Sequence, residues 1–190
     1  MLAKGVCKPH ISMTIHVDTR NMCSRTCTRI GAGAQVNVET SINACCSIKF
    51  ADSDEELEQG FKQEFPFAVR RRDDAGLADL TQKLMRHMNG LEIATALPLD
   101  IQATAFQRRV WTYLQSIGFG ETRSYSDVAK AIRRPSAVRA VAHACASNPV
   151  AIAIPCHRVV RSNGDLAGYR WGLERKKALL EIEAGKQYRP

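Results

Sequence analysis

Hydrophobic residues recur at two different spacings along this chain, and in the first half the spacing is typical of strands. Three early segments have the alternation or composition of β-strands: 11–17, 35–42 and 45–50. Gly31 and Gly33 predict a turn between the first two of these segments. A helix is expected to begin after Ser53, its N-cap, and to end near Glu64, and a second helix is expected over 77–88.

In the second half, apolar residues recur three or four positions apart, as they do on helices that face a core. Four helices are predicted there, over 103–117, 126–132, 137–146 and 171–185. Val150, Ile152 and Ile154 alternate with alanines in a run that is apolar on both faces, which predicts a buried strand. The connector 91–100 ends at the expected domain boundary. We therefore expect three parts: a divergent segment 1–44, the rest of an α/β lobe over 45–98, and a C-terminal domain over 99–185.

The helices over 126–132 and 137–146 are separated by a short basic turn, Arg133-Arg134-Pro135, as in a helix-turn-helix. Ser136 is placed to cap the second helix. Cys145 falls on the inner side of that helix. Its outer side is expected to carry mostly small residues: Arg139, Ala140, His143 and Ala144. Small residues let a helix backbone approach a ligand closely, although the same pattern occurs in ordinary helical cores.

Composition and charge narrow the class of protein. With 45% apolar and 24% charged residues over 190 positions, the chain has the values of a folded globular protein. No apolar stretch approaches the roughly 18 residues of a membrane span, and residues 1–10 lack the core of a signal peptide, so a cytoplasmic location without membrane contact is expected. Of the net charge of +8, residues 101–190 supply +9, from 15 basic and 6 acidic side chains. This concentration favours a polyanionic partner.

Cys156 stands directly before a potential base, His157. Seven cysteines, an odd number in a chain expected in a reducing compartment, argue against a disulfide framework. A thiol attacks as the thiolate, so His157 and nearby arginines such as Arg158 and Arg161 would activate it. Because neighbours in an extended chain point in opposite directions, His157 requires either a bend in the chain or an intervening water. Glu183 is the carboxylate expected to orient it. The alternative is that Cys156 is a buried core residue, as most cysteines are.

The run Pro155-Cys156-His157-Arg158-Val159-Val160 resembles the active-site signature of the methylated-DNA–protein-cysteine methyltransferases, the O6-methylguanine repair proteins. Further matches stand at the family's spacing: Ser124-Tyr125, Arg139-Ala140-Val141, Asn148-Pro149, Gly168-Tyr169-Arg170-Trp171-Gly172 and Glu183. The resemblance runs from about Leu97 to Glu183, less closely back to Cys46, and is closest to the C-terminal half of the bacterial adaptive-response protein. It implies an α+β fold, with a ribonuclease-H-like N-terminal lobe and a winged-helix, helix-turn-helix C-terminal lobe.

The resemblance also implies a function, the repair of O6-methylguanine in double-stranded DNA by a monomer. Cys156 would accept the methyl group in one irreversible displacement after base flipping, so that each molecule reacts once. His157, oriented by Glu183, would take the thiol proton through a water, and Tyr125 would donate a proton or hydrogen bond to the departing guanine. The size of alkyl group accepted, and activity on O4-methylthymine, stay open.

Other matched positions are implied to bind DNA or to shape the pocket. The DNA contacts would come from the second helix of the pair and its start: Ser136, Arg139, Ala140 and Ala144. Arg139 would fill the space that the flipped nucleotide leaves. The pocket and its support would be formed by Asn148, Gly168, Tyr169 and Arg170.

No cofactor is expected, because no glycine-rich loop suited to S-adenosylmethionine is present. Cys23 and Cys27, with Cys7 and His10, raise the question of zinc, but a partnering Cys-x2-Cys pair is absent, so no metal is expected. Residues 1–44 depart from the family and represent a divergent hairpin, a different start or an altered reading frame. Two rival functions remain: a helix-turn-helix regulator without cysteine chemistry, and a cysteine hydrolase that turns over an acyl substrate and ignores DNA.

Overall fold

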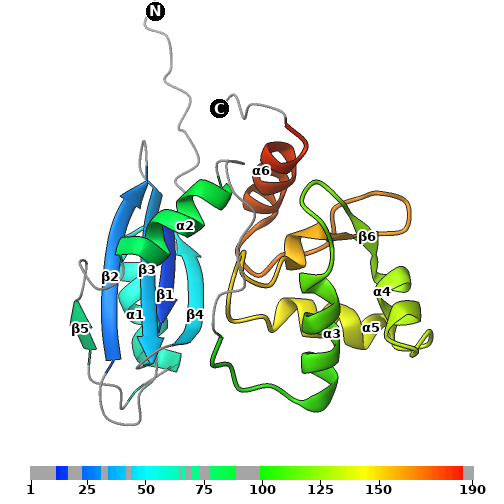
Figure 1. The fold of residues 1–190 in the computed structure, drawn as a ribbon, viewed down its shortest axis with the longest axis horizontal. Coiled ribbons are helices and arrows are strands. Elements are labelled where there is room, and N and C mark those ends of the chain that lie inside the picture. Colours follow the sequence, from blue (N-terminus) through cyan, green and yellow to red (C-terminus); the bar gives the residue numbers. More distant parts are fainter. Residues whose placement is uncertain are drawn as a thin grey trace, which may run out of the picture.

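A computed structural model of the chain describes residues 12–16, 23–30, 34–41, 44–64, 66, 70–72, 78–88 and 99–185. It has a mixed α/β architecture, with a sheet and two helices on one side and a group of helices on the other (Figure 1). The sheet contains β1 (Ser12–His16), β2 (Cys23–Ile30), β3 (Ala34–Ser41), β4 (Ala44–Ala51) and β5 (Arg70–Arg72), in the order β1-β4-β3-β2-β5. The helices α1 (Asp54–Glu64) and α2 (Ala78–Met88) pack against it.

The strands β2, β3 and β4 form an antiparallel series, β1 pairs antiparallel with β4, and β5 runs parallel to β2. The predictions of strands near β1, β3 and β4 are confirmed, but β2 was missed. Its sequence is mostly polar and lacks apolar alternation, so its pairing with β3 from Ser24 to Ile30 and with β5 from Cys23 to Arg25 defines it as a strand. The predicted turn at Gly31 and Gly33 and the connector 91–98 lie outside the described residues.

The C-terminal part consists of α3 (Ala105–Gln115), α4 (Tyr125–Ala131), α5 (Val138–Ala146) and α6 (Leu173–Glu183), with the short pair β6 (Arg123–Ser124) and β7 (Val159–Val160). Two N-terminal caps close into capping boxes, in which the side chains of the N-cap residue and of the third helical residue exchange hydrogen bonds with backbone amides. The cap residues are Thr104 for α3 and Ser124 for α4. The predicted N-cap of α1 is also confirmed, because Ser53 accepts from the Glu56 amide at 3.2 Å.

The predicted buried strand at 150–154 is wrong. The segment is buried as expected, but it forms turns, with the Ile154 amide donating to the Val150 carbonyl at 3.2 Å and Ile152 in the left-handed region at φ +67°. Only Val150 forms a bridge, to Ile48 of β4. An apolar run satisfies burial in either conformation, so its composition could not separate a strand from a buried loop.

One continuous core joins the sheet to the helices. Ile48 and Phe50 of β4 and Leu84 of α2 belong to the same buried cluster as the apolar faces of α3, α4, α5 and α6. The backbone also crosses at β4, where Ile48 donates to the Pro149 carbonyl at 2.9 Å and accepts from the Ala151 amide at 3.0 Å. The strand β4 therefore fixes the chain just before Cys156. In the described part of the chain, no helix is long and apolar enough to cross a membrane.

Candidate active site

Cys156 begins a short 3-10 helix, η1 (Cys156–Arg158), directly after Pro155. Its side chain is 2% exposed. The buried Asn148 amide donates to the Cys156 Sγ at 3.2 Å and to the Ile154 carbonyl at 2.8 Å, while its oxygen accepts from the Val150 amide at 3.0 Å. One side chain thus ties the irregular loop after α5 together and holds the sulfur.

Burial raises the pKa of the Cys156 thiol to about 11, against the opposing influence of the Asn148 hydrogen bond and the Lys176 and Arg170 charges. The thiol is therefore neutral near pH 7, and a base must remove its proton before it can act as a nucleophile. Burial, rather than the positive neighbours expected from the sequence, therefore has the largest effect on the pKa of Cys156.

His157 and Glu183 meet in the interior. The His157 ring is 0% exposed, and its Nε2 lies 2.8 Å from the Glu183 Oε1. Arg158, which we expected to face the thiol, instead binds Glu183: its Nε donates to Oε2 at 2.9 Å and its Nη2 to Oε1 at 2.9 Å. The Gly120 amide donates to the same carboxylate at 3.3 Å.

Burial by itself would raise the pKa of Glu183, but hydrogen bonds and charge from His157 and Arg158 outweigh it and hold that pKa at about 2. An ionised carboxylate only accepts hydrogen bonds, so the His157 Nε2 must carry the hydrogen. In the neutral ring this leaves Nδ1 as the basic nitrogen. Of the two alternatives expected for His157, a bend in the chain or an intervening water, the bend is present, because η1 follows Pro155.

Lys176 was not predicted from the sequence. This residue of α6 is fully buried, and its Nζ donates to the Val159 carbonyl at 2.6 Å and to the Ala167 carbonyl at 3.4 Å. It also lies 6.0 Å from the centre of the Tyr125 ring. Lysine is usually exposed, so composition argued against it. The available signal was spacing, because Lys176 precedes the buried Leu179 by three positions on α6.

Tyr125 is the first residue of α4 and is half-buried. Burial, assisted by the nearby sulfurs of Cys145 and Cys156, raises the pKa of its phenol to about 12. The hydroxyl consequently keeps its proton at neutral pH and can donate it in a hydrogen bond.

The loop Gly168–Gly172 packs Trp171 against the sheet and Tyr169 against Trp171. The Tyr169 and Trp171 rings meet edge to face with centroids 5.1 Å apart, and Trp171 meets Phe50 of β4 at 5.9 Å. The Tyr169 hydroxyl is buried without a hydrogen-bond partner among the described residues. Arg170 donates from Nη1 to the Asn148 carbonyl at 3.4 Å, whereas Gly168 is exposed.

The helix pair α4–α5 is present, with Arg133 at φ +58° closing the turn. Arg139 and Ala140 are exposed on α5, as expected. Two predictions for α5, the cap at Ser136 and the exposure of Ala144, are wrong.

Ser136 is exposed but does not cap α5, whose N-cap is Ala137 without a side-chain hydrogen bond.

Ala144, predicted on the outer side of α5, is only 1% exposed. The reason lies in α3, because Trp111 packs there and donates from Nε1 to the Ala144 carbonyl at 2.9 Å. Cys145 is buried, as expected. The accessible side of α5 is therefore narrower than the helical pattern suggested.

Among the described residues, no group of three or more histidine, cysteine or acidic side chains is placed to hold a metal ion. Cys7 and His10, which raised the question of zinc, lie outside the described residues. Cys23 and Cys27 belong to β2, where the structure describes the backbone alone.

Comparison with known proteins places these residues in a family context. Residues 105–185 match the family described as 6-O-methylguanine DNA methyltransferase, DNA binding domain. The chain is 45% identical over 152 residues to the bifunctional transcriptional activator/DNA repair enzyme Ada of Escherichia coli, covering 80% of this chain and 43% of Ada. It is 41% identical over 129 residues to the inducible methylated-DNA–protein-cysteine methyltransferase of Bacillus subtilis, covering 68% of this chain and 72% of that protein. The chain thus spans less than half the length of Ada.

Solved structures show the same relationship. The crystal structure of Mycobacterium tuberculosis OGT in complex with DNA superposes with a TM-score of 0.71 at 31% identity, over 85% of this chain and 93% of that one. The O6-methylguanine-DNA methyltransferase of the archaeon Pyrococcus kodakaraensis gives a TM-score of 0.53 at 26% identity, over 85% of this chain and 99% of that one.

Proposed function

This chain belongs to the family of methylated-DNA–protein-cysteine methyltransferases, and we propose that it repairs O6-methylguanine in DNA by moving the methyl group irreversibly onto Cys156. The observation that carries the proposal is the thiol of Cys156, held by Asn148 in the interior next to the His157–Glu183 pair. This arrangement offers a neutral nucleophile with its own base, within the residues that match the family.

In the proposed reaction, the Cys156 proton passes through a water to the His157 Nδ1. The thiolate attacks the methyl carbon in line, so that a sulfur–carbon bond forms as the carbon–O6 bond breaks. The departing guanine is stabilised by a hydrogen bond or proton from Tyr125, whose raised pKa keeps it protonated. The buried Lys176 and the Asn148 amide stabilise the thiolate. The product is a thioether, and removing its methyl group would require the Cys156 thiolate, a poor leaving group, to depart, so each molecule reacts once.

The proposed partner is double-stranded DNA containing O6-alkylguanine. Because the Cys156 sulfur is buried, a methyl group inside the duplex can reach it only after the nucleotide is flipped out. Arg139 and Ala140 are exposed on α5, suited to fill the vacated space and to lie against the minor groove, and Ser136 is exposed just before α5. We propose that the protein acts as a monomer on chromosomal DNA in the cytoplasm.

We also propose a finer fold for each of the two parts. The antiparallel strands β2, β3 and β4, followed by α1 and by β5 parallel to β2, support a ribonuclease-H-like N-terminal lobe. The α4–α5 pair with the β6–β7 ribbon supports a winged-helix C-terminal lobe over 99–185, the proposed DNA-binding and alkyl-acceptor domain. The remainder, 45–98, shares its sheet with strands from 1–44.

Intact-protein mass spectrometry after mixing with a duplex that contains O6-methylguanine tests the function. We expect a gain of one methylene, located on Cys156 by peptide mapping and saturating at one equivalent per protein. Cys156→Ala should bind the same duplex without any gain in mass. Binding by the wild type with no gain in mass would favour a regulator. Repeated turnover of an acyl substrate, independent of DNA, would favour a cysteine hydrolase. Either result would overturn the proposal.

A further inference from the structure

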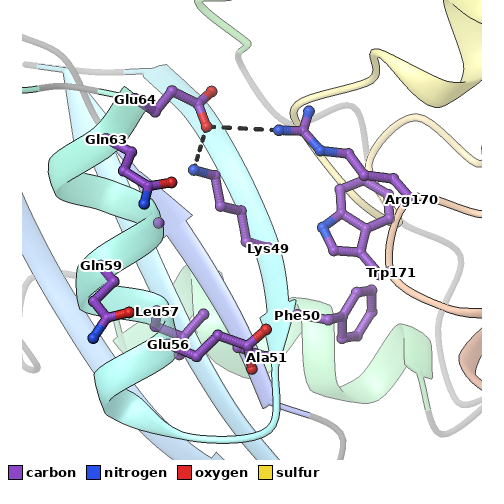
Figure 2. Close-up of a pocket in the computed structure, with 11 residues that line it drawn as sticks. Lys49, Phe50, Ala51, Glu56, Leu57, Gln59, Gln63, Glu64, Arg170 and Trp171 are labelled. Carbon is purple, nitrogen blue, oxygen red and sulfur yellow. Dashed lines mark ion pairs between the residues drawn. The ribbon is translucent and has the colours of Figure 1, made fainter.

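A cavity of about 540 Å³ lies between the two parts of the molecule, where α1 and β4 face the loop that carries Arg170 and Trp171. Figure 2 shows Glu64 at the end of α1, with its carboxylate between Lys49 of β4 and Arg170. Lys49 and Glu64 form an ion pair, and the same Glu64 oxygen lies 3.7 Å from the Arg170 Nη2. A single carboxylate therefore joins the sheet to the loop.

The contacts continue from Arg170 to the nucleophile. Its Nη1 donates to the Asn148 carbonyl at 3.4 Å, and the Asn148 side chain donates to the Cys156 Sγ at 3.2 Å. The two ends of the Arg170 guanidinium thus have different partners. Nη2 faces the Glu64 carboxylate of α1, and Nη1 binds the backbone carbonyl of Asn148, the residue whose side chain holds the sulfur.

We propose that Glu64 is a positioning residue for methyl transfer, acting through Arg170 on the turn at Asn148 that presents the Cys156 sulfur. The inference rests on the proposed function, but it concerns a residue outside the segment that matches the family's DNA-binding domain. In this view the N-terminal lobe contributes to the chemistry by restraining one guanidinium.

The geometry explains why Glu64, and not the lobe interface as a whole, has this role. Lys49 is nearly buried and anchors the carboxylate, so Glu64 has little freedom to turn away from Arg170. Elsewhere the interface has independent contacts: Phe50 packs on Trp171, and Asp52 pairs with Arg175. Removing the Glu64 charge should therefore free one end of the Arg170 guanidinium without separating the lobes.

The expected loss of rate in Glu64→Gln follows from the solvent exposure of the Glu64–Arg170 ion pair. The side chains of Glu64 and Arg170 are 32% and 37% exposed, so their attraction is partly screened by water. Asn148 also keeps its own bonds to the Ile154 carbonyl and the Val150 amide. We therefore expect Glu64→Gln to slow transfer by about two- to fivefold, the effect of a weakened, partly exposed ion pair.

The test compares Glu64→Gln, Arg170→Gln and the double variant with the wild type. Single-turnover transfer is measured at saturating O6-methylguanine duplex, and the Kd for the duplex and the thermal midpoint are measured separately. Glu55→Gln is the matched control, because it removes the same charge from an exposed position on the same helix. We expect Glu64→Gln alone to lower the rate constant with Kd and midpoint unchanged, Glu55→Gln to match the wild type, and Glu64→Gln to have no further effect in the Arg170→Gln background.

A second readout needs neither DNA nor activity. The side-chain amide resonances of Asn148 in a nitrogen-15 NMR spectrum of the DNA-free protein should shift in Glu64→Gln and stay in place in Glu55→Gln. An unchanged Asn148 signal, an unchanged rate constant, or a full Glu64→Gln effect in the Arg170→Gln background would overturn the positioning role. A wild-type protein that transfers no methyl group would instead refute the proposed function, and the NMR comparison would still decide whether Glu64 positions Asn148.

Discussion

Replacing Glu183 by glutamine tests the electrostatic centre of the site. Glutamine has the shape of a protonated glutamate, so Glu183→Gln removes the charge and keeps the volume. The variant leaves the buried guanidinium of Arg158 without an ionised partner and no longer requires the hydrogen of His157 on Nε2. Both stability and chemistry should therefore respond.

The magnitude follows from the pKa of Glu183, which lies at about 2 in the folded protein instead of an ordinary 4.5. At about 1.36 kcal/mol for each pH unit, this separation corresponds to roughly 3 kcal/mol of folding free energy. This value is of the same order as the loss of stability on breaking a buried ion pair, about 3–5 kcal/mol. Because the folded pKa is the lower one, this stabilisation is fully present above pH 4.5 and is lost as the pH falls toward 2.

Urea unfolding followed by far-UV circular dichroism, from pH 7 down to pH 2.5, measures the effect. We expect Glu183→Gln to be less stable than the wild type by about 3 kcal/mol at pH 7, with the gap closing below pH 4.5. Glu181→Gln, two positions earlier on α6, should stay within about 0.5 kcal/mol of the wild type at every pH. A gap below 1 kcal/mol at pH 7, or one that does not narrow in acid, would refute the reasoning.

Three further predictions test the surroundings of the site. Gly120→Ala should lower the free energy of unfolding in urea by about 2 kcal/mol more than Gly164→Ala. Both glycines have positive φ, but of the two only the Gly120 Cβ would meet a backbone atom, the carbonyl oxygen of Glu183 at 2.9 Å. Equal losses in the two variants would contradict this prediction. Ser124→Ala should lower the unfolding free energy by about 1 kcal/mol through the lost capping box of α4, and an unchanged midpoint would show that the cap contributes nothing. Alkylation of Cys156 by iodoacetamide, followed by peptide mapping, should accelerate about tenfold per pH unit from pH 7 to 9.5 because the pKa is about 11, and a plateau below pH 8 would mean that the thiol is already ionised.

Local features were predictable from the sequence because they depend on neighbours within a few positions. The apolar stripe of α3 could be predicted from the helical spacing of its hydrophobic residues. The N-cap at Ser53 could be predicted from a single hydroxyl before a helical segment. The Cys156-His157 pair could be found from its sequence motif, and the Glu183 carboxylate from its position in the C-terminal helix. The pairing of His157 with Glu183 follows from placing α6 against η1.

Tertiary structure decided which partner each charged or apolar group meets. The polar strand β2 exists because β3 and β5 pair with it, and Ala144 is buried because Trp111 of α3 covers it. Arg158 binds Glu183 rather than the thiol, since the end of η1 and the end of α6 converge.

What the sequence by itself determined is the local set of helices, the Cys156-His157 motif and the basic character of the C-terminal half. Only the folded structure placed Glu64 beside Arg170 and buried Lys176. The physical reason is that periodicity and capping act within a few residues, whereas burial and charge pairing depend on which distant segments share a core. The pKa values of the site therefore follow from packing and could not be obtained from residue type alone.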